Sequence, residues 1–186
     1  YSKERRQIKA FSGYIRKPVF LISSDYLYLC SDNTKETFMY FKDIIGQEEI
    51  KKQLIHSAQT GVVPHAQLFT EQGGAGAFPL ALAYGRYLNC THRTETDACG
   101  RCPSCLKFNE LAHPDLHFVF PIVAKKEKKK EVCDDYLTEW RGFLKERPYF
   151  NIDGWLDYID AGNSQAIIYS KESDEIIRKL NLKIYE

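Results

Sequence analysis

The sequence lacks a long hydrophobic run, since no apolar stretch approaches the roughly 18 residues needed to span a bilayer. The nearest candidate lies at 19–30, where Ser-Ser-Asp at 23–25 interrupts the apolar residues. A secretory signal peptide needs an unbroken apolar segment and a small-residue cleavage site, and this segment has neither. We therefore expect a cytoplasmic protein and predict two short strands, at 19–22 and 26–30, joined by a turn.

The sequence also lacks an excess of charge of either sign. Its 26 Lys and Arg residues balance 25 Asp and Glu residues, which leaves a net charge of +1. This balance argues against a generally basic nucleic-acid-binding surface and against an acidic tail. The local exception is a lysine run that either binds nucleic acid or forms a solvated loop: Lys125, Lys126, Lys128, Lys129 and Lys130.

Cysteines are few for a disulfide-stapled protein of 186 residues, and their distribution is uneven. Four of the six form one short cluster with the spacing Cys90-x8-Cys99-x2-Cys102-x2-Cys105. Zinc in structural sites takes four such ligands in a tetrahedral arrangement. Because four thiolates leave no open coordination position, we predict that these cysteines hold a structural zinc ion rather than a catalytic one.

Two other interpretations of the cluster stay open, namely disulfides or four unrelated thiols. Disulfides would require an exported protein, and the sequence carries no export signal. His92 and His113 flank the cluster, but four cysteines already complete a tetrahedron, so neither histidine is expected to be a ligand. Cys30 and Cys133 are expected to be plain thiols.

Helix and strand patterns alternate along the rest of the chain. Apolar residues at Ile50, Leu54 and Ala58 predict a helix over 47–60 that ends at Gly61. A second helix is expected to begin near Pro79, with a buried stripe made of Leu80, Ala83, Tyr84, Tyr87 and Leu88. Further strands are expected at 67–70, 116–123 and 165–169, and further helices at 137–144, 155–159 and 174–180. This alternation favours the α/β class.

A glycine-rich loop between the strand at 67–70 and the helix near Pro79 has the context of a phosphate-binding P-loop but not its chemistry. A P-loop reads G-x-x-x-x-G-K-[ST], in which the lysine neutralises phosphate and the hydroxyl holds magnesium. Here Glu71 replaces the first glycine, and Ala77 and Phe78 replace the lysine and the hydroxyl residue. We predict a degenerate loop that does not bind ATP, with the positions Glu71, Gly74, Gly76, Ala77 and Phe78. Taken alone, the loop could also be a glycine-rich turn unrelated to nucleotides.

Six motifs follow one another along the chain. They are Phe41-Lys-Asp-Ile-Ile-Gly-Gln47, His65-Ala-Gln-Leu-Phe69, the degenerate loop, Leu88-Asn-Cys90, Cys99-Gly-x-Cys102-x-x-Cys105 and His113-Pro-Asp115. Over 39–123 they resemble the N-terminal region of the clamp-loader subunits of bacterial DNA polymerase III, the gamma/tau and delta-prime subunits. The resemblance implies a partial AAA+ nucleotide-binding fold, with a parallel sheet, flanking helices and an inserted zinc module.

The resemblance also implies a branch of the family and its partners. Motor subunits of this family keep the P-loop lysine and threonine, so Ala77 and Phe78 point to the delta-prime branch, which is often the non-hydrolysing stator. Such a subunit is not an enzyme by itself but works within the DNA polymerase III holoenzyme during DNA replication. The implied partners are the gamma/tau and delta subunits and, through the assembled complex, the sliding clamp and primed DNA. The alternatives are a gamma/tau-like ATPase and a zinc-ribbon module that binds nucleic acid.

Departures from the family pattern suggest how the chain is divided. Residues 1–38 have no counterpart, and Met39 lies where family members begin, so 1–38 is interpreted as an extension upstream of the true start. Residues 39–186 are interpreted as the N-terminal part of an AAA+ domain, with the zinc module at 90–105 and an insertion at 124–170. The family's acidic pair after an apolar strand and its Ser-Arg-Cys motif are absent, so the chain is expected to be roughly the first half of the protein.

Overall fold

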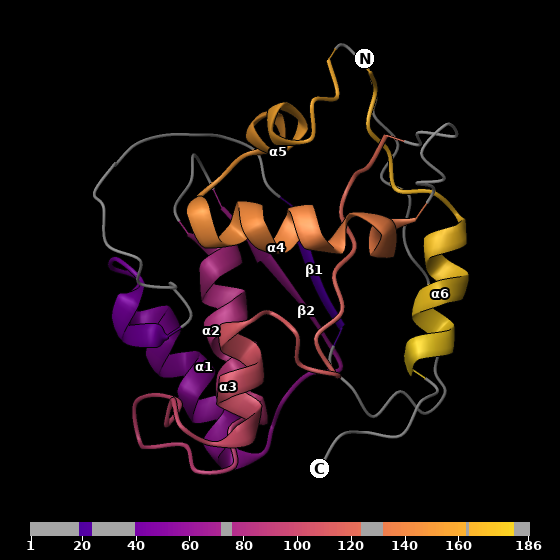
Figure 1. Ribbon diagram of the computed structural model, residues 1–186. Coiled ribbons are helices and arrows are strands. Elements are labelled where there is room, and N and C mark those ends of the chain that lie inside the picture. Colours follow the sequence, from indigo (N-terminus) through magenta and orange to yellow (C-terminus); the bar gives the residue numbers. More distant parts are fainter. Residues whose placement is uncertain (1–18, 24–39, 72–75, 124–131, 163, 181–186) are drawn as a thin grey trace, which may run out of the picture.

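A computed structural model describes residues 19–23, 40–71, 76–123, 132–162 and 164–180 (Figure 1). The helices are α1 (Glu48–Thr60), α2 (Ala77–Asn89), α3 (Pro103–Asn109), α4 (Leu137–Glu146), α5 (Ile152–Tyr158) and α6 (Lys171–Leu180). Two short 3-10 helices are η1 (Phe41–Asp43) and η3 (Cys133–Tyr136). The strand expected at 26–30 and the lysine run at 125–130 lie outside the described residues.

Two strands, β1 (Val19–Ser23) and β2 (Ala66–Thr70), pair in parallel with Val19 opposite Ala66 and Ser23 opposite Thr70. The strand predictions at 19–22 and 67–70 are therefore confirmed. A parallel pair needs a crossover connection, and α1 lies in the segment that joins the two strands (Figure 1). Within the described ranges the sheet has only these two strands, so helices predominate and the wider parallel sheet of the expected fold is not seen there.

The strands predicted at 116–123 and 165–169 are wrong. Both segments form no strand, and they meet only in one antiparallel bridge between Ile122 and Ile167. Pro121 lies in the middle of the first segment and has no amide hydrogen to donate to a ladder. A run this apolar can be buried without forming a strand, provided that its backbone groups find other partners.

Side chains of the following helices supply those partners for the 116–123 segment. The Trp155 Nε1 donates to the Pro121 carbonyl at 2.9 Å, and the Tyr136 hydroxyl donates to the Val123 carbonyl at 2.6 Å. The buried Cys133 thiol donates to the Phe120 carbonyl at 3.2 Å. The segment is therefore fixed by side chains from η3 and α5 instead of by a neighbouring strand.

Helix α2 is buried along its length from Ala77 to Tyr87, so the predicted single buried stripe is too narrow. It lies against α1, α3 and both strands (Figure 1). The predicted helix over 47–60 is confirmed as α1, and Gly61 ends it in the left-handed conformation, with φ of 72°. On the face expected to be buried, Ala58 is buried, but Ile50 is 43% exposed.

An aromatic core covers the N-terminal half of α2. Trp140 of α4 stacks on Phe120 with ring centroids 4.1 Å apart, and Trp155 of α5 meets Trp140 edge-on at 4.8 Å. Phe78 of α2 meets both Trp140 and Phe150 edge-on, which joins α2 to this core. The helices predicted around 137–144, 155–159 and 174–180 are confirmed as α4, α5 and α6.

Among the described residues, no helix combines the length and apolar character that a membrane crossing requires.

Replacing Trp155 with alanine should lower the free energy of unfolding by about 3–5 kcal/mol, because a fully buried ring is removed and a cavity is left. Ile177→Ala is the matched control, since Ile177 is 59% exposed and should cost less than about 0.5 kcal/mol. Urea unfolding followed by circular dichroism measures both changes. Equal losses in the two variants would contradict the central position of Trp155 in the aromatic core.

Candidate functional site

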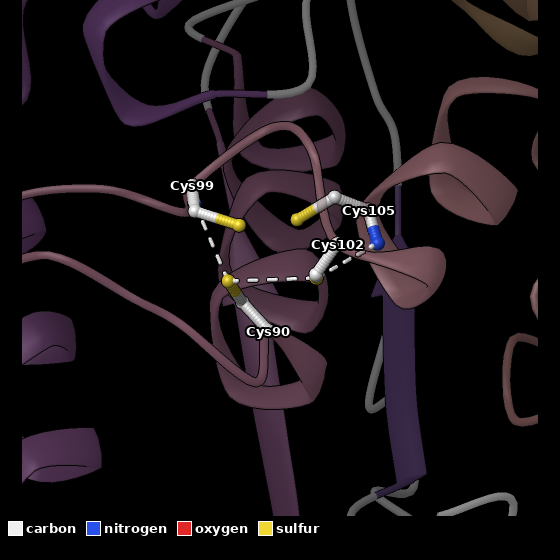
Figure 2. A group of neighbouring side chains, drawn as sticks. All are labelled: Cys90, Cys99, Cys102 and Cys105. Carbon is white, nitrogen blue, oxygen red and sulfur yellow. Dashed lines mark hydrogen bonds between the residues drawn. The ribbon is translucent and has the colours of Figure 1, made fainter.

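Three elements bring the four clustered cysteines together (Figure 2). Cys90 ends α2, and Cys102 caps the N-terminus of α3, where its sulfur accepts a hydrogen bond from the Cys105 amide at 3.4 Å. Cys105 lies in the first turn of α3, and Cys99 lies on the loop between the helices, where its amide donates to the Cys90 sulfur at 3.3 Å. All four sulfur atoms lie within 4.8 Å of one another.

The donor set fits a tetrahedral metal ion. The five cysteines that the structure describes are all free thiols, so the disulfide interpretation has no support within the described residues. The Cys90 and Cys102 sulfurs are 4.0 Å apart. Zinc–sulfur bonds of about 2.3 Å place tetrahedral ligands about 3.8 Å from one another. These four cysteines could therefore bind a metal ion.

The thiols of the cluster differ in their tendency to ionise. Burial raises the pKa of Cys90 to about 12. Burial also opposes ionisation of Cys102, but hydrogen bonds from the Cys105 amide and Thr91 outweigh it and lower the pKa of Cys102 to about 5. Metal binding requires thiolates, so a bound cation would have to displace the proton that the Cys90 thiol otherwise keeps.

The loop that carries Cys99 is tied to the N-terminal part of the described chain. The Asp97 carboxylate accepts hydrogen bonds from the Phe41 and Lys42 amides at 3.3 and 3.1 Å. The Gln59 side-chain amide of α1 donates to the Glu95 carbonyl at 2.9 Å. These contacts connect the cysteine cluster to the Phe41 motif. In the sequence, the cluster and the motif were two separate features.

Gly100 allows the close packing beside the cluster. Its φ of 75° is left-handed, and a Cβ there would lie 2.6 Å from the Tyr40 hydroxyl oxygen. Tyr40 therefore covers the turn between Cys99 and Cys102.

Arg86 lies beside the cluster and was not among the candidate residues singled out from the sequence. Its side chain is fully buried on α2, and its Nη2 donates to the Tyr40 hydroxyl, to the Cys105 carbonyl at 3.3 Å and to the Asn109 Oδ1 at 2.7 Å. Burial raises the pKa of Cys105, and the Arg86 guanidinium opposes this shift. The available signal was a single charged residue inside the otherwise apolar sequence of α2.

The two flanking histidines have other roles in the structure. His113 is buried against the Phe108 ring, and burial lowers its pKa. Its Nδ1 accepts from the Asp115 amide at 3.1 Å, beside a turn at Pro114 and Asp115. His92 is exposed and contacts Thr91.

Of the two cysteines outside the cluster, Cys133 is buried near Phe120, and Cys30 lies outside the described residues.

The degenerate loop joins β2 to α2, and four of its five predicted positions are described, while Gly74 is not. Gly76 caps α2 in the left-handed conformation, with φ of 89°, and offers no side chain to the free amides of the first turn. The Glu71 carboxylate supplies the missing acceptor, since its Oε2 accepts from the Ala77 amide at 2.6 Å. The Glu71 carboxylate thus lies at the N-terminus of α2, which is the positive end of the helix dipole.

The residues in the lysine and hydroxyl positions of a P-loop are both buried. Ala77 packs in the core shared with α1 and β2, and Phe78 packs in the aromatic core. A Cβ on Gly76 would lie 2.8 Å from the Tyr149 ring, so an aromatic side chain also approaches the loop closely. Neither buried residue offers a charge or a hydroxyl group to a ligand.

A pocket of about 300 Å³ opens beside this loop. It lies between α1, β2 and the start of α2, and Gln47, Glu71 and Ala77 are among its lining residues. In a strand–loop–helix unit the helix N-terminus is where a phosphate binds. The wall of the pocket at that end carries the Glu71 carboxylate.

The described site is a strand–loop–helix unit that lacks phosphate-binding side chains and adjoins a four-cysteine cluster. Residues 46–153, more than half of the chain, match the family described as DNA polymerase III, delta subunit, and the chain belongs to this family. This match supports the clamp-loader family that the motifs indicated.

Curated relatives match parts of the chain. A DNA polymerase III subunit tau/gamma of Haemophilus influenzae is 34% identical over 76 residues, which is 41% of this chain and 11% of the relative. A subunit tau of Escherichia coli is 30% identical over 76 residues, which is 41% of this chain and 12% of the relative. A subunit gamma of Buchnera aphidicola is 30% identical over 96 residues, which is 51% of this chain and 26% of the relative. The matches thus span about a tenth to a quarter of the relatives' length. No solved structure matches the chain.

Replacing Glu71 with alanine should lower the free energy of unfolding by about 0.5–2 kcal/mol, the cost of losing a helix cap. Glu71→Gln keeps an acceptor for the Ala77 amide but removes the charge at the helix N-terminus, so its loss should be smaller. Glu49→Ala is the control, because Glu49 is an exposed acid in the first turn of α1 whose partner is the exposed Lys52. Urea unfolding compares the three variants, and the capping role is wrong if Glu71→Ala and Glu49→Ala lose the same amount.

Proposed function

We propose that this chain is a delta-prime-like, non-hydrolysing subunit of a bacterial DNA polymerase III clamp loader. In this role it supports the loading of the sliding clamp onto primed DNA during replication. Its partners are the gamma/tau and delta subunits, and it meets the clamp and DNA as part of the assembled complex. We further propose that Cys90, Cys99, Cys102 and Cys105 hold one structural zinc ion.

The observation that carries the proposal is the hydrogen bond from the Ala77 amide to the Glu71 carboxylate. A nucleotide phosphate would need this same amide at the N-terminus of α2. It would also approach a carboxylate with no lysine nearby in the loop to neutralise it, because Ala77 and Phe78 replace the lysine and the hydroxyl residue. Like charges a few ångströms apart repel, so the site disfavours a triphosphate.

Phe78 supports the same conclusion. Its ring contacts Phe118, Trp140 and Phe150 in the aromatic core. Moving Phe78 aside to admit a magnesium-bound phosphate would break these contacts. A subunit that does not cycle through nucleotide states keeps one conformation, so neighbouring ATPase subunits contact a surface that does not change. The close packing of α2 is consistent with this role.

The zinc proposal is supported by the chemistry of the donor set. Four sulfur ligands leave no open position for water or substrate, so the ion would be structural. It would join the C-terminal end of α2, the N-terminus of α3 and the loop between them, which the Asp97 carboxylate ties to the Phe41 motif. Without the ion, the exposed loop at 91–96 has few apolar contacts to hold it.

The alternative functions each have an observation in their favour. The curated relatives carry the names gamma and tau, so a gamma/tau-like ATPase is the first alternative. The lysine run at 125–130 favours the second alternative, a zinc module that binds nucleic acid directly. Nucleotide and DNA binding separate the three functions.

Purified protein should neither bind Mg–ATP in isothermal titration calorimetry nor release phosphate from it above background, with a P-loop ATPase as the positive control. Turnover of ATP would support the gamma/tau-like alternative. In the same preparation, binding to primed DNA should be weak. A tight interaction whose affinity falls steeply with salt would support the nucleic-acid-binding alternative.

Protein purified without chelators should contain one zinc ion per chain by mass spectrometry of metals. Cys102→Ser should lose most of the zinc and should speed hydrogen exchange over 90–111, because a ligand and the connection it makes are removed. Cys133→Ser is the matched control, since it removes a buried thiol outside the cluster and should keep the zinc. A Cys102→Ser protein with unchanged zinc content would refute the ligand assignment.

A further inference from the structure

Arg86 carries a buried charge that has no acidic hydrogen-bond partner among the described residues. The side chain is 0% exposed, and its three hydrogen-bond partners are the neutral Tyr40 hydroxyl, the Cys105 carbonyl and the Asn109 side-chain amide. Its Nε and Nη1 atoms are buried and make no hydrogen bond. In the part of the chain that the structure describes, Arg86 forms no salt bridge.

This arrangement is costly unless a negative group lies nearby. Transferring a charge from water into the protein interior costs several kcal/mol, and proteins normally pair such a charge. The Tyr40 ring lies under the guanidinium, 3.7 Å from its carbon to the ring centroid. A cation–π contact of this kind contributes about 2 kcal/mol when desolvated, but it does not neutralise the charge.

With a metal bound, the cysteine cluster would be a negative group next to Arg86. Arg86 lies four residues before Cys90, the C-cap of α2, so the two residues are about one helical turn apart. Arg86 also bonds the carbonyl of Cys105, a second member of the cluster. Four thiolates around a divalent ion carry a net charge of −2, and this charge would lie at the C-terminal end of α2, where the helix dipole is already negative.

We propose that Arg86 is the charge-balancing and positioning residue of the four-cysteine metal centre. The guanidinium offsets part of the negative charge of the metal–thiolate cluster, and its bond to the Cys105 carbonyl holds the first turn of α3 in place. This inference rests on the proposed metal centre and adds a residue that supplies no ligand atom. Loss of such outer partners costs about 10- to 100-fold in metal affinity.

Two variants test the charge. Arg86→Met keeps a long, unbranched side chain at this position but removes the positive charge. Asn109→Asp leaves Arg86 in place and gives it a carboxylate at the position of the present Oδ1 acceptor, 2.7 Å from Nη2, so the guanidinium is neutralised locally. Tyr87→Phe is the matched control, because Tyr87 is buried next to Arg86 on α2. Its hydroxyl donates a neutral hydrogen bond to the carbonyl of Thr94, which lies on the loop between Cys90 and Cys99.

Zinc affinity is measured by chelator competition on the whole chain, and Co²⁺-loaded protein is measured by absorption spectroscopy. Arg86→Met and Asn109→Asp should both bind zinc about 10- to 100-fold more weakly, whereas Tyr87→Phe should stay near the wild type. A nearby cation stabilises sulfur lone pairs, so its loss should move the sulfur-to-cobalt charge-transfer bands to longer wavelength in the two charge variants only.

The outcomes separate the two proposals. Wild-type protein that binds no metal would overturn the metal centre and the role of Arg86 with it. Metal binding with unchanged affinity and unchanged bands in Asn109→Asp would overturn the role of Arg86 alone, because a purely structural Arg86 gains a salt bridge in this variant. Asn109→Asp therefore decides the question even where Arg86→Met does not fold.

Discussion

The burial of α2 around its whole circumference is the constraint on which the rest of the structure depends. A helix that is apolar on every side needs a partner on every side. Helix α1 and β2 cover one part of its surface, α3 covers another, and the aromatic core of α4 and α5 covers the N-terminal half through Phe78 and Leu82. Both candidate sites lie at the ends of this helix, so their geometry follows from how firmly α2 is held.

Charged side chains lie at each end of α2, where the helix dipole is strongest. At the positive end, the carboxylate of Glu71, a residue outside the helix, accepts a hydrogen bond from the Ala77 amide. At the negative end, four cysteines gather next to a buried arginine. A helix that binds a phosphate offers its N-terminal amides to it, whereas here the Ala77 amide already donates to Glu71.

The elements that were predicted correctly are those whose patterns depend on neighbours in the sequence. Gly61 after the periodic residues of α1 marks the helix end, and Pro79 marks the first turn of α2. The segment at 116–123 was predicted wrongly because a run of apolar residues says that a segment is buried but not what covers it. Its carbonyls bond to Trp155, Tyr136 and Cys133, which lie 13 to 34 residues away in the chain, and Pro121 prevents a regular ladder.

The sequence by itself determined which four cysteines form the cluster, and it determined that Ala77 and Phe78 stand where a P-loop has its lysine and its hydroxyl residue. Both are local facts of the sequence, because a turn and a helix cap bring together cysteines that lie close to one another in the chain. Only the tertiary structure decided that Glu71 caps α2, that Asp97 holds the Phe41 motif, and that Arg86 lies beside the cluster. Each of these contacts joins residues that lie on different elements, so it depends on how those elements pack. The packing depends on the fit between the surfaces of several helices, which no single segment of the sequence specifies.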